Sequence, residues 1–112
     1  MALLTPWGEA LDPQNVLPEY PRPQLVRGNW QNLNGHWDFA ITSAGQTDRP
    51  TSWDGRILVP FSPEAPLSGV ERQLQPDQAL FYRRTFPVPD GPEGRVLLHF
   101  GAVDQSCTVT VN

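Results

Sequence analysis

Hydrophobic and polar positions alternate in several short stretches of the chain. In "HWDFAI", Trp37, Phe39 and Ile41 share one face of an extended segment, while polar or small residues occupy the other. This period of two is typical of a half-buried β-strand. Similar patterns predict four further strands, at residues 56–61, 79–88, 95–102 and 106–112. The segment "PDGPEG", residues 89–94, is predicted to form a tight turn. We therefore expect an all-β protein with no helix longer than a turn or two.

The first 26 residues lack any sustained period. They contain five prolines, and each residue before a proline is driven out of the α region of backbone space. We predict that residues 1–26 form an extended arm over the surface of a domain at 27–112, with a short helical turn at 29–33. The prolines of the arm are Pro6, Pro13, Pro18, Pro21 and Pro23.

Composition supports short strands and narrows the class of partner. The 112 residues include 13 Pro and 9 Gly, which both disfavour long helices. The net charge is -4, and the eight basic residues, all Arg, form no basic run. Such a chain is poorly suited to binding nucleic acid, so we expect no nucleic-acid partner. No apolar run is long enough to cross a bilayer, so we expect no membrane partner.

Two features favour a cytoplasmic location. The start "MALLTPWGEALD" has no cationic segment, and Pro6 interrupts its apolar run, which argues against a signal peptide. The single cysteine, Cys107, cannot form a disulfide within the chain. Because Cys107 alternates with Val109 and Val111, we expect its thiol to lie in the core, where it would not be reactive.

The polar residues predict no catalytic residue, no metal ligand and no cofactor site. His36 and His99 are far apart and have no Cys or carboxylate at metal-ligand spacing. The serines lack the Gly-x-Ser-x-Gly context of a nucleophile elbow. A glycosidase-like carboxylate pair could be formed only by Glu64 and Glu71 across their loop, and we favour two solvated charges.

Aromatic residues give a stronger signal. We expect Trp37 to fill the core and Trp30 to hold the arm in place. For Trp7 and Trp53, internal packing and contact with a ligand at the surface both remain open. Exposed tryptophans stack on sugar rings, so a free-standing carbohydrate-binding module with aromatic stacking platforms is an alternative interpretation.

The adjacent pair Arg83 and Arg84 occupies opposite faces of a predicted strand. One guanidinium is therefore expected on the buried side. A buried cation needs a carboxylate partner, and Asp38 or Asp104 could supply it.

Four segments together resemble the N-terminal domain of glycoside hydrolase family 2. They are "YPRPQLVRGNWQNLNGHWDF", "ILVPFSPEAPLSGV", "FYRRTFPVP" and "VLLHFGAVDQSCTVTVN", in the order and spacing of that family, from about Pro6 to the last residue. The resemblance implies a galactose-binding-like fold, often called the sugar-binding domain. The expected structure is a partial antiparallel jelly-roll β-sandwich, the front part of such a domain.

The resemblance also implies a function for the larger enzyme. That enzyme would be a retaining β-glycosidase of carbohydrate metabolism, β-galactosidase-like, which hydrolyses O-glycosyl bonds. The family's two catalytic glutamates belong to a later barrel and match no residue of this chain. The segment would be a non-catalytic fragment whose partners are the C-terminal domains of the same chain. A homo-oligomer is a further possible assembly. A pure interface domain for oligomer assembly is a third interpretation of the function. Its pocket-rim residues would be Pro63, Glu64 and Ser68.

Overall fold

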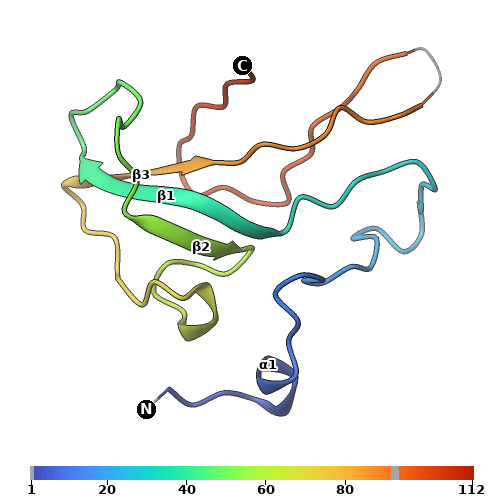
Figure 1. The fold of residues 1–112 in the computed structure, drawn as a ribbon, viewed down its shortest axis with the longest axis horizontal. Coiled ribbons are helices and arrows are strands. Elements are labelled where there is room, and N and C mark those ends of the chain that lie inside the picture. The colour runs from blue at the N-terminus through green and yellow to red at the C-terminus, as the bar shows by residue number, and fades with distance from the viewer. Residues whose placement is uncertain (1, 92–93) are drawn as a thin grey trace.

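A computed structural model describes residues 2–91 and 94–112 and contains one three-stranded antiparallel sheet (Figure 1). The strands are β1 (Gly35–Ser43), β2 (Gly55–Val59) and β3 (Gln78–Arg83), in the order β2-β1-β3. A helix of one turn, α1 (Pro6–Glu9), and a 3-10 turn, η1 (Pro66–Ser68), complete the regular structure of the described residues. The all-β prediction is confirmed at this level.

The central strand β1 forms where the alternation predicts it. Trp37 faces Ile57 of β2 across the sheet, and Phe39 faces Tyr82 of β3. These side chains lie on one face, as the period of two requires. β2 ends before Pro60, which has no N–H to donate to a neighbouring strand.

The core is small and is centred on β1 and β2. Phe39 and Ala40 are consecutive residues of β1, and both are buried although their side chains point to opposite faces of the sheet. The centre of the sheet is therefore covered on both sides. Among the described residues, five hydrophobic residues are buried: Val16, Phe39, Ala40, Ile57 and Leu58.

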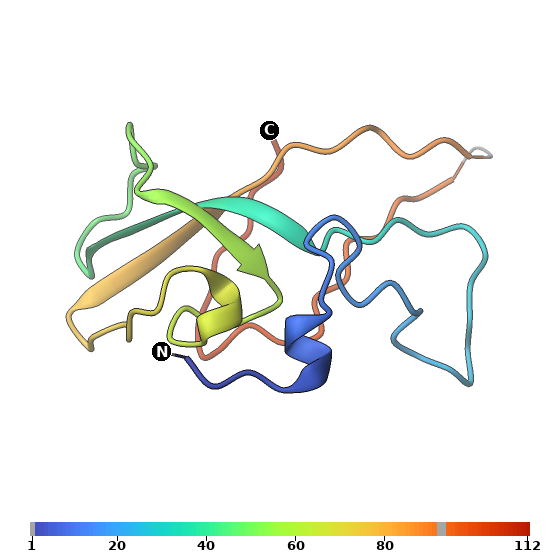
Figure 2. The ribbon, with the colours of Figure 1, turned by 60° about the horizontal axis from the view of Figure 1, so that its bottom comes forward.

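The N-terminal arm is irregular but attached to the domain. The hydroxyl of Thr5 caps α1 by accepting a hydrogen bond from Gly8 N at 3.1 Å. Val16 is buried, and the side-chain amide of Asn32 donates to its carbonyl at 3.4 Å. Figure 2 shows α1 and η1 close together below the sheet. A Cβ on Gly8 would lie 3.5 Å from the side chain of Leu67, the central residue of η1, which agrees with that view.

The predicted helical turn at 29–33 is wrong. These residues have no helical hydrogen bonds, and Asn34 N donates instead to the side-chain oxygen of Asn32 at 2.8 Å. Asparagine side chains compete in this way with helical backbone bonds. Asn34 also donates through its side chain to Val16 O at 3.3 Å, so the segment joins the arm to the start of β1.

The last two predicted strands are also wrong. β3 ends at Arg83, and residues 94–112 contain no strand and are all exposed. Cys107 is exposed rather than in the core. Figure 1 shows this part of the chain, in orange to red, running back toward the sheet as irregular backbone and ending at the C-terminus. Alternation gives a segment an apolar face, but a strand also needs a neighbouring strand to which it is hydrogen-bonded. Within the described part of the chain, no strand pairs with residues 94–112. Pro92 and Glu93 of the predicted turn lie outside the described residues.

Candidate functional site

The loop between β2 and β3 holds the three predicted pocket-rim residues. Ser68 is only 2% exposed. Its Oγ lies 2.7 Å from Ala65 O and 3.1 Å from Pro63 O, and it accepts a hydrogen bond from Val70 N at 3.0 Å. The hydroxyl therefore fixes the shape of the loop and does not face solvent.

Glu64 lies differently from Ser68 although both belong to the same loop. Its side chain is exposed, whereas Pro63 is half-buried and its carbonyl accepts a hydrogen bond from Arg72 N at 3.0 Å. Burial raises the pKa of Tyr82, and the negative charge of Glu64 raises that pKa further. Glu64 is thus the predicted rim residue that presents a charge to solvent, on the side of β3. Glu71, the other carboxylate of the loop, is also exposed.

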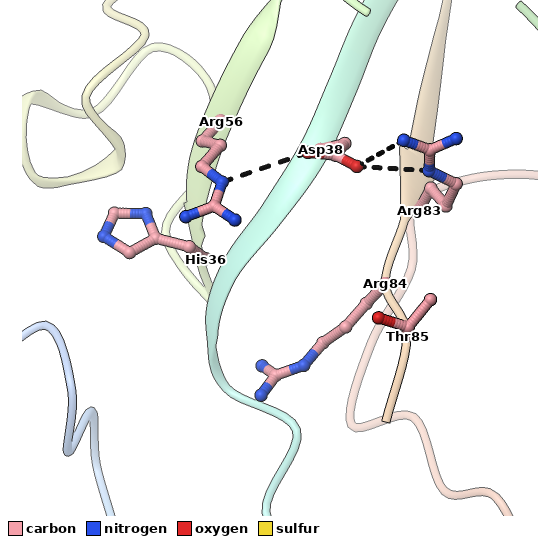
Figure 3. A pocket seen from close by; sticks show the side chains of 6 residues that line it. All are labelled: His36, Asp38, Arg56, Arg83, Arg84 and Thr85. Carbon is pink, nitrogen blue, oxygen red and sulfur yellow. Dashed lines mark hydrogen bonds and ion pairs between the residues drawn. The ribbon is translucent and has the colours of Figure 1, made fainter. Parts of the chain in front are cut away.

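A row of charged residues crosses the three strands on one face of the sheet. Asp38 in β1 is directly opposite Arg56 in β2 and Arg83 in β3. Arg83 donates from Nε and Nη2 to Asp38 Oδ2 at 3.1 and 2.7 Å. Arg56 Nε lies 4.0 Å from Asp38 Oδ1, a looser ion pair (Figure 3). The guanidinium of Arg83 also lies over the ring of Trp53, 4.6 Å from its centroid.

Arg84 is half-buried and has a different kind of partner. Its Nη1 donates to Leu33 O at 2.6 Å and to Asn34 O at 2.8 Å, just before β1. Gly35 follows with a φ of 123°, and a Cβ there would lie 3.2 Å from this Nη1. Glycine therefore permits both the backbone conformation and the close approach of the guanidinium.

The prediction for the arginine pair needs a correction. The arginine that pairs with Asp38 is the exposed Arg83, and the half-buried Arg84 is bound by carbonyls rather than by a carboxylate. Asp104 forms no ion pair within the part of the chain that the structure describes. The carbonyl oxygens of Leu33 and Asn34, just before β1, accept hydrogen bonds from Nη1 of Arg84, where a carboxylate was expected. They do not neutralise its charge.

These side chains surround a hollow of about 200 Å³, lined by His36, Asp38, Arg56, Arg83, Arg84 and Thr85 (Figure 3). A second hollow of about 180 Å³ shares His36, Arg56 and Arg84, and Pro13 and Gln14 of the arm also line it. Three guanidinium groups face one carboxylate, so the lining is net positive in a chain whose net charge is -4.

The sequence did not reveal this cluster, because its arginines come from separate strands and form no basic run. The register of β1 with β2 would have revealed it, since that register sets Asp38 opposite Arg56. The one indication in the sequence is that Arg83 and Arg84 are adjacent in a predicted strand, which predicts that one guanidinium lies on the buried side.

The tryptophans lie outside both hollows. Trp37 is half-buried, and its Nε1 donates to Leu33 O at 2.8 Å. Trp30 packs edge-on against Tyr20 of the arm, with ring centroids 4.8 Å apart. Trp7 is 80% exposed. Trp30 therefore packs against the arm as expected, whereas Trp37, which was expected to fill the core, is half-buried on β1 and packs edge-on against Tyr82.

Within residues 2–91 and 94–112, no three His, Cys, Asp or Glu side chains gather closely enough to hold a metal ion. The helices of the same residues are too short and too polar to cross a membrane. Comparison with protein-family models finds no match for the chain, and neither does comparison with curated proteins.

Proposed function

We propose that the chain is a non-catalytic part of a family 2 glycoside hydrolase, with a structural role in a β-galactosidase-like enzyme. The resemblance in the four quoted segments supports this proposal. Three of those segments contribute β1, β2 and β3 of the observed sheet, as "HWDF", "ILV" and "FYR". The full jelly roll is part of the proposal, as is a cytoplasmic location.

The observation that carries the proposal is the exposed apolar surface that follows β3. The two stretches predicted as strands here, 95–102 and 106–112, each place apolar residues on one face, as at Val96, Leu98 and Phe100. Their side chains are nevertheless open to water: Val96 is 70% exposed, Phe100 47%, Val109 48% and Val111 66%. Contiguous exposed apolar residues mark surfaces that contact other protein. In the proposed enzyme, further strands of the jelly roll would cover this face.

The loop between β2 and β3, residues 60–77, is called the rim loop here and has a defined part in this proposal. Ser68 holds the loop in shape from inside, and Glu64 presents a carboxylate at its surface. Neither residue is assigned a catalytic role. A retaining glycosidase needs two carboxyl groups about 5 Å apart, and Glu64 and Ser68 together supply one. The proposed catalytic glutamates belong to another domain of the enzyme.

The exposed face provides the first test. The purified chain is expected to self-associate through residues 95–111, as measured by light scattering during a thermal melt. Replacing Val96 and Val109 by Asp should suppress association, because charge opposes burial of an apolar face. Leu3→Asp is the matched control, since Leu3 is 95% exposed in the arm. A monomeric wild-type chain with one sharp melting transition would contradict the proposal.

Hydrolysis provides the second test. The 112-residue chain should not release the aryl group of an aryl β-galactoside above the uncatalysed rate. Robust turnover that disappears in Glu64→Gln and also in Glu71→Gln would show instead that the loop is an active site, because a glycosidase needs both carboxyl groups.

The exposure of Trp7 supports a second candidate, the free-standing carbohydrate-binding module. A stacking platform would quench tryptophan fluorescence on titration with a β-linked oligosaccharide, and Trp7→Ala would abolish the change. We expect no saturable change, because neither hollow beside the sheet is lined by tryptophan.

A further inference from the structure

We propose that the hollow between Arg56, Arg83 and Arg84 binds a phosphate or sulfate group. This inference is independent of the proposed glycosidase function. It rests on the charges and hydrogen-bond donors that the three strands bring together, and no residue of the site belongs to the rim loop.

The first argument is uncompensated charge. Among the described residues, Asp38 is the only carboxylate that lines either hollow, and it accepts hydrogen bonds from Arg83. Arg84 is half-buried, and among the described residues its guanidinium donates only to carbonyl oxygens, which leave its positive charge in place. Arg56 reaches Asp38 only at 4.0 Å. An anion between Arg56 and Arg84 would supply the charge that the described residues lack.

The second argument concerns free donors. A guanidinium has five N–H groups. In Arg84 the two on Nη1 are used by Leu33 O and Asn34 O, and among the described residues its Nε and Nη2 donate to no acceptor. Arg56 makes no hydrogen bond within the same residues. These two side chains can therefore donate several charge-assisted hydrogen bonds to one oxyanion.

The third argument is that two of the arginines are already held in position. Two carbonyls fix Arg84, while Asp38 and the ring of Trp53 fix Arg83. Ordering a long side chain during binding costs free energy, and this cost is largely avoided where the side chain is fixed beforehand. Asp38 thus acts as a positioning residue for Arg83.

The shape of the site selects the class of anion. Figure 3 shows the arginines approaching from different strands, Arg56 from β2 on one side of β1 and Arg84 from the end of β3 on the other. Donors from several directions suit a tetrahedral anion better than a planar carboxylate, which has only two oxygens. The hollow of about 200 Å³ has room for a phosphate or sulfate with a small organic substituent.

Equilibrium dialysis of the 112-residue chain against labelled inorganic phosphate or sulfate tests the proposal at any association state. Chloride is used to hold the ionic strength constant. We expect saturable binding of one anion per chain. Arg56→Gln should weaken it about tenfold or more, since a charge-assisted hydrogen bond is lost. The matched control is Arg49→Gln, which removes the same charge from an exposed loop and should bind as the wild type does.

Arg84→Gln also removes the contacts to residues 33 and 34, so Arg84→Lys accompanies it. The lysine keeps the charge but lacks the planar fork, and weaker binding by a folded Arg84→Lys chain supports the site. A parallel titration with phenyl phosphate distinguishes a phosphate ester from the free ion as the ligand. If phenyl phosphate binds more tightly than inorganic phosphate, the ligand is an ester. If the two bind equally, the ligand is the free ion. Binding that chloride abolishes, or that Arg49→Gln weakens as much as Arg56→Gln, would overturn the proposal.

Discussion

The central strand β1 and the C-terminal segment at 106–112 share one sequence pattern and have opposite structures. In β1, Trp37, Phe39 and Ile41 alternate with other residues, and hydrogen-bonded neighbours flank the strand on both sides. In the C-terminal segment, Cys107 and Val109 alternate with threonine and serine just as regularly, yet the segment is exposed and unpaired within the described residues. Alternation thus determines which side chains share a face, while pairing depends on what lies beside the strand.

The sheet and the C-terminal segment should differ most in how they respond to lost apolar volume. Ile57 is 0% exposed, so Ile57→Ala should lower the free energy of unfolding by about 2–4 kcal/mol through lost burial and a cavity. Val96 is 70% exposed, and Val96→Ala should change the free energy of unfolding by about 0.5 kcal/mol or less. Urea denaturation followed by circular dichroism measures both.

This pair of variants can break the comparison. Equal small losses would mean that the sheet is as loosely packed as the C-terminal segment. Equal large losses would mean that residues 95–111 are buried in solution, either within the chain or between copies, and dilution would separate those two cases.

The rim loop belongs with the sheet in this comparison, and Ser68→Ala tests that. The substitution removes the hydroxyl that bonds Ala65 O and Val70 N inside a buried site. Leaving those groups without a partner should cost about 1–3 kcal/mol of unfolding free energy. Ser62→Ala is the control, because Ser62 is exposed in the same loop. A loss no larger than that of the control would place the loop with the loosely held regions.

The charged row across the sheet should contribute less than the core. Asp38→Asn removes the ion pair with Arg83, whose side chain is 55% exposed. Exposed ion pairs contribute about 0.2–1 kcal/mol, so we expect a loss within that range. Denaturation in low and high salt checks the origin: the difference between wild type and variant should shrink as salt rises. A difference that salt does not change would point to packing instead.

Local patterns were enough to predict the sheet but not the site. The alternation at Trp37 and Phe39 and the proline after Val59 mark β1 and the end of β2, because these features act within a few residues. The hollow depends on Asp38 meeting Arg56 and Arg83, which is a matter of register between distant segments. The position of Arg84 depends on carbonyl oxygens, which every residue carries and which therefore leave no signal in a sequence.

The smallest expected effect is the titration of Tyr82, which tests whether the rim loop stays beside β3. Burial, and then the charge of Glu64, raises the pKa of this phenol above its ordinary value of 10.0. The folded state therefore retains the proton longer than the unfolded state. The stability contributed by the neutral phenol is fully present below pH 10 and is lost as the pH rises through the higher, folded pKa.

Ultraviolet absorbance of tyrosinate measures this titration, and Tyr82→Phe identifies the step that belongs to Tyr82. Glu64→Gln should move that step towards 10.0 without removing the shift entirely, since burial is the larger cause. Glu71→Gln removes the same charge from the same loop and should move it less. If wild-type Tyr82 titrates at its ordinary value, or if both glutamate variants move the step equally, Glu64 does not stay beside β3. The rim loop would then be as free of the sheet as the C-terminal segment is.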